Sequence, residues 1–219
     1  MDWLSVYKGG TAEIEEKKSR FIATIEPVSS EEEAVSFIAS VKKKYWDARH
    51  NCSAFVIGEN GEKTRCSDDG EPSGTAGRPM LDVLTKEHIT NVCVVVTRYF
   101  GGTLLGTGGL VRAYSGAVKA GLANCEIINK IQGFCVNIQC DYNDFGKVQS
   151  MVGRSDCHMM DIDYAQEVSA SIVTDNAQKL TDEITDITSG RALIKDIVPT
   201  VFAVIDGEVR VMEGGDGYG

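Results

Sequence analysis

The first 128 residues alternate between strand-like and helix-like patterns of apolar side chains. Residues 11–16 and 20–27 are alternating or β-branched, which predicts two paired strands joined by a turn at 16–19. A helix is predicted over 30–45, because a serine cap precedes three glutamates and apolar residues recur on one face. Further strands are predicted over 51–58, 63–66 and 92–98, and apolar residues at helical spacing predict a helix from Gly109 onward.

After Asn129 the pattern restarts. The predicted elements, in order, are strand 131–139, helix 144–153, strands 158–163 and 167–173, helix 176–188 and strand 200–205. This βαββαβ order predicts a ferredoxin-like domain. We therefore expect an α+β protein with an N-terminal domain over 1–128 and a C-terminal domain over 129–219, whose glycine-rich end at 214–219 is mobile.

Composition supports two domains of a cytosolic protein. The 219 residues are 42% apolar, no run of apolar residues is long enough to span a membrane, and the first residues lack the pattern of a secretory signal. The seven cysteines contain no C-x-x-C pair and mostly lie in apolar runs, so we expect buried thiols rather than disulfides or a metal site.

The net charge of −10 is unevenly distributed. Residues 1–130 carry 17 acidic and 16 basic side chains, a net charge of −1, whereas residues 131–219 carry 15 and 6, a net charge of −9. Arg98, Arg112 and Lys119 lie in a stretch, 88–125, that has no carboxylate. The acidity therefore excludes general nucleic-acid binding only for the C-terminal part, and a local positive region remains in the N-terminal part.

Glycines mark the candidate ligand site. Nine of the 23 glycines lie between Cys66 and Val118, and the second group leads directly into the predicted helix. A strand, a loop of free amides and a helix start form a site that favours anions, especially phosphate. The candidate ligands are the amides of the loop glycines, two hydroxyls and a guanidinium group: Gly101, Gly102, Gly108, Gly109, Thr103, Thr107, and Arg98 or Arg112.

Two observations limit this interpretation. The segment 101–109 has the G-x-x-x-x-G spacing of a nucleotide-triphosphatase loop, but Thr107 and Gly108 stand where Lys and Ser or Thr are required, so that class is excluded. The structural alternative is a tight turn from strand to helix whose glycines only avoid strain. Arg49 and His50, with the basic segment 17–20, could extend the positive surface, and ordinary solvated charge is their alternative.

An acidic loop precedes the glycine-rich one. Asp68, Asp69 and Glu71 could coordinate Mg²⁺ or act as acid and base. The preferred interpretation is that they form turns and accept backbone hydrogen bonds, with Arg65, Arg78 or Arg98 neutralising them. His50 and Cys52 share a strand face, as a cysteine nucleophile and its base would, but Cys52 begins an apolar run and is expected to be buried. We predict no cofactor.

Four motifs, taken together, resemble the YigZ/IMPACT family. They are KKSRFIA at 17–23, ARHNCSAFVIG at 48–58, SDDGEPSGTAGRPML at 67–81 and VVVTRYFGGTLLGTGGLVRAYSGAV at 94–118. The resemblance is to the bacterial two-domain members. It implies an N-terminal domain like domain IV of elongation factor EF-G and the GHMP kinases, with a left-handed βαβ crossover, and a C-terminal domain like EF-G domains III and V. For eukaryotic IMPACT proteins it implies regulation of translation, by competition for the activator of a starvation-responsive kinase.

The first functional hypothesis is a non-enzymatic regulator of translation or of a stress response. It would bind ribosome or RNA phosphate, or a translation-related protein, through the N-terminal domain and would involve no membrane. The alternatives are an enzyme that acts on a small phosphorylated or carboxylated metabolite through Asp68, Asp69 and Glu71, and a module that binds a peptide or protein through exposed Tyr99, Phe100, Leu104 and Leu105.

Overall fold

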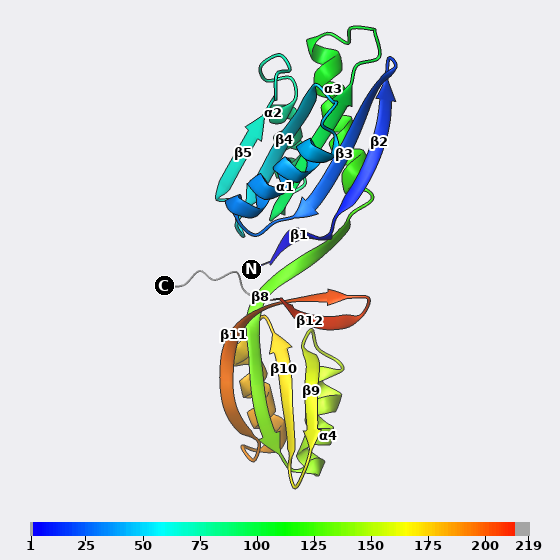
Figure 1. Cartoon of the computed structure of the whole chain (residues 1–219). Coiled ribbons are helices and arrows are strands. Elements are labelled where there is room, and N and C mark those ends of the chain that lie inside the picture. Colours follow the sequence, from blue (N-terminus) through cyan, green and yellow to red (C-terminus); the bar gives the residue numbers. More distant parts are fainter. Residues whose placement is uncertain (1, 213–219) are drawn as a thin grey trace. The chain divides into compact units, whose positions relative to one another are not determined.

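The computed structural model describes residues 2–212, and its contacts divide the chain into two units (Figure 1). The N-terminal unit is Trp3–Ile128, and the C-terminal unit runs from Asn129 and includes Asp2. Each unit combines a sheet with helices, so the chain has a mixed α+β, two-domain fold. The predicted mobile end, 214–219, lies outside the described residues. No helix within 2–212 is both long and apolar enough to cross a membrane.

The N-terminal unit contains three helices. Its elements are β1 (Asp2–Lys8), β2 (Gly10–Glu16), β3 (Ser19–Pro27), α1 (Glu31–Lys44), β4 (His50–Ile57), β5 (Lys63–Ser67), α2 (Gly77–Lys86), β6 (Ile89–Thr90), β7 (Val92–Tyr99) and α3 (Thr107–Leu122). The next strand, β8 (Glu126–Cys140), begins in this unit and continues into the other. The strands and the helix expected before residue 70 are confirmed to within two residues.

A five-stranded antiparallel sheet, in the order β2-β3-β7-β4-β5, organises the N-terminal unit. Helix α1 covers one face, where Ala34 and Phe55 pack with Cys93. Helices α2 and α3 cover the other face, over Val94 and Val96 (Figure 1). Because β7 is central and covered on both sides, its apolar residues form a continuous run instead of alternating.

Helix α2 and strands β1, β6 and β12 were not predicted. Pro79 occupies the third position of α2, where its missing N–H removes no hydrogen bond within the helix. Strand β12 (Glu208–Met212) follows a turn at Asp206 and Gly207, both with positive φ. Such an Asp-Gly pair between apolar segments is typical of a β-hairpin turn, and the sequence analysis did not use it.

The C-terminal unit forms a second antiparallel sheet. It contains α4 (Tyr142–Val152), β9 (His158–Tyr164), β10 (Val168–Thr174), α5 (Ala177–Thr188), β11 (Leu193–Ile205) and β12. Within this unit the strands pair in the order β12-β11-β8-β10-β9, and every pair is antiparallel. Val136, Ile138, Phe145 and Ile184 lie in the core that the two helices share with the sheet. Strand β11 begins at Leu193 rather than at the predicted residue 200, since its first residues are mostly exposed and have no clear apolar pattern.

Candidate functional site

One end of the N-terminal sheet brings the four sequence motifs together. Strand pairing places Arg20 opposite Tyr99, His50 opposite Arg98 and Ser53 opposite Ser67, so the loops that adjoin these positions share an edge. We call this edge the loop end and define it as residues 17–20, 43–50, 67–77 and 98–112. It is uppermost in Figure 1. Segments up to about ninety residues apart in sequence therefore contribute to one surface.

Asp68 closes the start of α2. Its carboxylate accepts hydrogen bonds from the amides of Gly74, Ala76 and Gly77 at 2.8, 3.0 and 2.8 Å. Burial opposes the charge of this carboxylate, but the three amide donors outweigh that effect and hold the pKa of Asp68 below its usual value. The first loop thus contains an anion site that the protein fills with its own carboxylate.

Asp69 ties the same loop to α1 and β4. Its carboxylate accepts a hydrogen bond from the Asn51 amide at 2.7 Å and pairs with Lys42 Nζ at 2.6 Å. The backbone carbonyl of Asp69 lies 2.9 Å from His50 Nδ1. His50 therefore contacts the acidic loop directly.

Glu71 is the centre of a buried polar network. It accepts hydrogen bonds from Arg98 Nη1 at 2.7 Å and from the Tyr114 hydroxyl at 2.8 Å, and Cys52 Sγ lies 3.3 Å from that hydroxyl. The side chains of Arg98 and Glu71 are only 8% and 3% exposed. Burial raises the pKa of Tyr114, and burial raises the pKa of Cys52 to about 12. Cys52 is therefore an unreactive buried thiol, as the preferred interpretation expected.

This network decides between the two roles that the sequence left open for Arg98: it neutralises a carboxylate of the acidic loop and is not placed to bind a phosphate. The guanidinium group lies 5.4 Å from the centroid of the Phe21 ring and 5.6 Å from that of Phe100, and its only hydrogen-bond partner among the described residues is Glu71. An arginine that neutralises a buried carboxylate is not available to an external phosphate. All three carboxylates of the acidic loop accept hydrogen bonds inside the protein, which matches their structural interpretation, and no three metal-ligating side chains within residues 2–212 form a group that could hold a metal ion.

The start of α3 is open. Gly106 precedes the helix with φ 73° and ψ 167°, a conformation that only glycine adopts readily, and no side chain among the described residues caps the helix. The Leu110 amide bonds to the Gly106 carbonyl, but the amides of Thr107, Gly108 and Gly109 meet no acceptor within the described chain. Three donors at the helix start therefore have no partner among the described residues.

Arg112 lies beside these amides. A Cβ atom placed on Gly108 would be 3.7 Å from Arg112 Nη1, so the guanidinium reaches the first turn of α3. Arg112 is exposed and has no carboxylate partner in the part of the chain that is described. Thr103 and Thr107 are exposed in the same loop. Of the two arginines that the sequence left open, the structure brings Arg112 and not Arg98 to the candidate site.

The other predicted glycines have different roles. The Gly101 amide donates to Ser19 Oγ at 3.1 Å, and a Cβ atom at Gly101 would lie 2.0 Å from the Lys18 backbone. Gly101 therefore permits close packing between the loop and the β2–β3 turn. Gly102 has φ 82° and open space around it. Arg49 is exposed at the loop end and forms no ion pair with another described residue.

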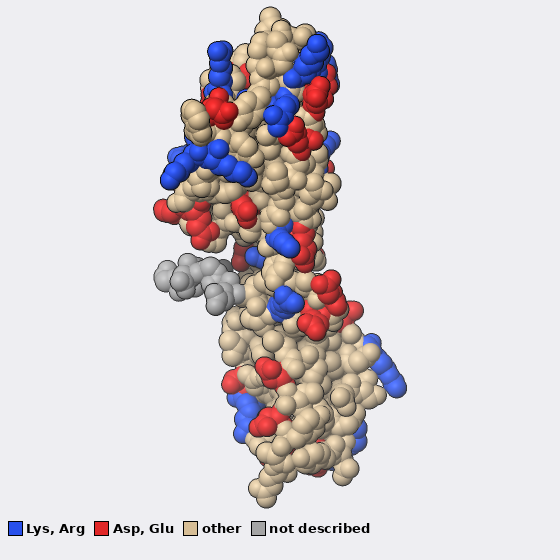
Figure 2. Space-filling view, turned by 45° about the vertical axis from the view of Figure 1, so that its right-hand side comes forward, with Lys and Arg blue, Asp and Glu red and all other residues tan. Residues whose placement is uncertain are grey.

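Basic side chains without a partner outnumber free carboxylates at the loop end. Within residues 2–212, no carboxylate pairs with the side chains of Lys17, Lys18, Lys43, Arg49 or Arg112. Blue side chains stand near the upper end of the N-terminal unit in Figure 2, with red ones beside several of them. Most of the carboxylates of this region are engaged in the contacts described above, so the unpaired charge is mainly positive.

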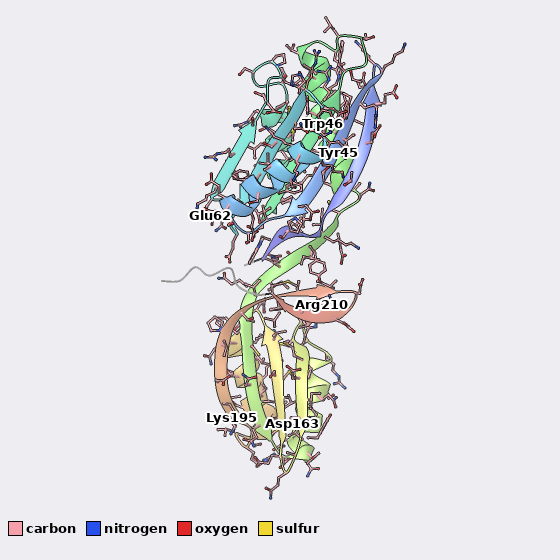
Figure 3. The ribbon with its side chains drawn as sticks, viewed as in Figure 1. Tyr45, Trp46, Glu62, Asp163, Lys195 and Arg210 are labelled. Atoms are coloured by element: carbon pink, nitrogen blue, oxygen red, sulfur yellow. The ribbon has the colours of Figure 1, made fainter. Side chains whose placement is uncertain are left out.

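The sequence reasoning missed two aromatic residues at this end. Trp46 is 82% exposed and Tyr45 is half-buried, in the segment between α1 and β4 (Figure 3). Leu104 is also 82% exposed and Phe100 is 53% exposed, whereas Leu105 is buried. The sequence feature that could have identified them is the pair of adjacent aromatic residues, Tyr45 and Trp46, between Lys44 and Arg49.

Comparisons with known proteins identify the family. Residues 17–122 match the Impact N-terminal domain, and residues 138–191 match a domain of unknown function, DUF1949. IMPACT family member YvyE of Bacillus subtilis is 40% identical over 196 residues, which cover 89% of this chain and 90% of that protein. IMPACT family member YigZ of Escherichia coli is 39% identical over 164 residues, covering 74% and 80%. The chain belongs to the IMPACT family.

Two solved structures are also similar. A crystal structure described as that of a hypothetical protein has 33% sequence identity and a TM-score of 0.58, and the match covers 90% of this chain and 96% of that one. A structure titled as the two-domain translational regulator Yih1 has 30% identity over 54% of this chain and 47% of that one, with a TM-score of 0.38.

Proposed function

We propose that this IMPACT-family protein has a role in translation regulation and binds RNA phosphate, on the ribosome or free, at the start of α3. Proteins named IMPACT in eukaryotes are among its relatives, which supports a role related to translation. The observation that carries the proposal is the group of three amides at Thr107, Gly108 and Gly109, which have no acceptor within residues 2–212 and lie beside Arg112. A cytoplasmic location follows from this role.

A helix start with a nearby guanidinium group suits a phosphate for two reasons. The partial positive charge of the helix N-terminus and the unsatisfied amides both favour an anion. An exposed guanidinium adds charge-assisted hydrogen bonds in a geometry that fits phosphate oxygens. Lys17, Lys18 and Arg49 at the same end supply further positive charge for neighbouring phosphates.

The finer fold assignments are part of this proposal. The order β11-β8-β10-β9, with α4 and α5 between strands in the chain, is the arrangement of a ferredoxin-like domain, and this supports that assignment for the C-terminal unit. The family resemblance supports kinship of the N-terminal unit with EF-G domain IV. The strong negative charge of the C-terminal unit would keep that unit away from nucleic acid.

Arg112→Ala tests the site directly. Binding of a structured RNA, and separately of ribosomes, is measured for the full chain at several salt concentrations. We expect Arg112→Ala to weaken binding and to reduce the slope of log affinity against log salt by about one, because one phosphate contact is lost. Arg98 is not a suitable test residue. Its replacement would leave the buried Glu71 carboxylate without a cation and so destabilise the fold.

Lys119→Ala is the matched control. It removes one positive charge from the same helix, about 18 Å from Thr107 along the axis. We expect it to leave affinity and salt slope nearly unchanged. Equal effects of the two variants would show that only net charge matters, and absence of binding by the unmodified protein would exclude the proposed function.

A further inference from the structure

Aromatic and basic side chains gather at the same end of the sheet as the candidate phosphate site, on the side that carries α1. The aromatic cluster is Tyr45, Trp46 and Tyr99, with Arg20 and Lys44 against it. The Arg20 guanidinium lies 5.5 Å from the centroid of the Tyr99 ring, and Lys44 Nζ lies 5.0 Å from that of Tyr45. Two of the three rings therefore already have a cation of the protein on one face.

Trp46 differs from the other two rings. It makes no ring–ring or cation–ring contact with the described residues, and 82% of its surface is exposed. Its neighbour Asp47 accepts a hydrogen bond from the Tyr99 hydroxyl at 2.8 Å, and this hydrogen bond raises the pKa of Tyr99. The backbone around Trp46 is thus anchored to the sheet, while the indole ring itself is available.

The charges around the cluster favour a nucleic acid over a protein. Lys43 and Arg49 flank it without a carboxylate partner within residues 2–212. The nearby carboxylates of Glu13 and Asp47 are engaged, the first by Arg20 in a two-point ion pair and the second by Tyr99. Protein–protein interfaces are rich in aromatic residues and arginine but depleted in lysine, whereas Lys43 and Lys44 adjoin this cluster. Here one open ring stands among cations, the combination that binds single strands.

We propose that Trp46 is a stacking platform for an unpaired base of single-stranded RNA whose phosphates lie against the basic residues of the loop end. This inference rests on the proposed function, because it names the form of RNA that the same end of the protein takes. A flat indole ring stacks on the face of any base, so the platform gives preference for single strands over duplexes but little preference for sequence.

The fluorescence of Trp46 reports the contact. Trp3→Phe leaves Trp46 as the single tryptophan, and this change is mild because the buried Nε1 of Trp3 has no hydrogen-bond partner in the described structure. The variant is titrated with an oligoadenylate of about a dozen nucleotides, with an abasic strand of equal length and with a duplex of equal length. We expect quenching by the oligoadenylate alone, and weaker binding of the abasic strand.

Substitutions separate stacking from phosphate binding. Trp46→Ala is expected to weaken oligoadenylate binding about tenfold or more, and Trp46→Phe much less, because a phenyl ring still stacks. Tyr142→Ala, which removes an aromatic residue that is 54% exposed in the C-terminal unit, is the control and is expected to have no effect. Binding in these assays is measured by anisotropy of a labelled strand, so that the Ala variant needs no tryptophan signal.

The outcomes distinguish the two proposals. If Arg112→Ala weakens binding of all strands while Trp46→Ala weakens none, the stacking inference is wrong and the phosphate site stands. If Trp46→Ala weakens binding and Arg112→Ala does not, the phosphate site is wrong and the platform stands. If no nucleic acid changes Trp46 emission, the inference is overturned and the aromatic cluster is better suited to a protein partner.

Discussion

The loops that lead into α2 and α3 lie at the same end of one sheet, and both are rich in glycine. They differ in whether the first amides of the helix donate to an acceptor from the protein itself. In the first loop, Asp68 accepts hydrogen bonds from Gly74, Ala76 and Gly77. In the second, nothing in the described chain accepts from the amides of Thr107, Gly108 and Gly109. The first loop also contributes Glu71 to the buried network, whereas Arg112 beside the second loop is exposed and pairs with no carboxylate of residues 2–212.

The difference shows how one local pattern produces two results. A helix start attracts negative charge in either case. Where a carboxylate of the chain reaches the amides, the attraction stabilises the fold, and where none does, the same amides remain for an anion from outside. A glycine-rich loop before a helix therefore indicates a ligand site only after the internal acceptors have been identified.

The largest expected effect comes from breaking the buried pair of the first loop. Arg98→Ala leaves the Glu71 carboxylate buried and without its cation, and we expect the free energy of unfolding to fall by about 3–5 kcal/mol. Urea denaturation followed by tryptophan fluorescence measures this, because Trp3 and Trp46 both lie in the N-terminal unit. A loss of this size would confirm that the first loop is structural.

Arg20→Ala is the control for that measurement. Its ion pair with Glu13 is about half exposed on both sides, and solvent screens such pairs, so little change in stability is expected. The double variant Arg98→Met with Glu71→Gln should recover much of the loss, since neither charge is then buried alone. Equal stability of Arg98→Ala and Arg20→Ala would contradict the role given to the network.

Sequence patterns predicted the elements of the fold better than the roles of the site residues. Continuous or alternating apolar residues marked β3, β4 and β7, because a strand that is buried on one or both faces carries apolar side chains at the buried positions. Arg98 and Arg112 could not be told apart in this way. Both lie in a stretch without carboxylates, and the partner of Arg98 comes from Glu71, 27 positions away, through the tertiary fold.

The glycine count was similarly ambiguous. Gly101 and Gly106 belong to the same run of sequence, but the first allows the backbone to pack against Lys18 and the second sets the backbone angle that opens the helix start. A sequence shows that both positions lack a side chain, and only neighbouring atoms show which constraint applies at each. The exposure of Trp46 was hidden for the same reason, because amino-acid type indicates burial for most aromatic residues.

A smaller effect is expected from weakening the carboxylate that closes α2. Asp68→Asn should lower the free energy of unfolding by about 2 kcal/mol at neutral pH, because amide hydrogen bonds to a charged acceptor become bonds to a neutral one. Asp82→Asn removes the same charge from an exposed pair on α2 and should change little. Urea midpoints of the two variants and the unmodified protein give the comparison.

The pH dependence of that effect has a definite sign. Folding lowers the pKa of Asp68, so its carboxylate stabilises the protein above the unfolded value near 3.8, and this stabilisation is lost as pH falls through the lower, folded value. The stability difference between the unmodified protein and Asp68→Asn should therefore narrow from about pH 5 downward. A difference that stays constant with pH would show that charge does not hold the first loop closed.

The smallest effect on stability tests the open loop. Gly108 is exposed, and a side chain there would make ordinary contacts. Gly108→Ala should raise the free energy of unfolding by about 0.5–1 kcal/mol, because alanine loses less backbone freedom in a helix, and it should leave RNA binding intact, because the amides remain.

Gly108→Asp should be at least as stable as Gly108→Ala, since a carboxylate in the first turn favours the helix and can pair with Arg112 four residues later. It should nevertheless lose binding, because the second loop would then be closed by a carboxylate of its own, as the first already is. Urea denaturation and RNA titration of both variants separate helix stability from anion binding, and equal RNA affinity of the Ala and Asp variants would mean that the amides at the start of α3 bind no phosphate.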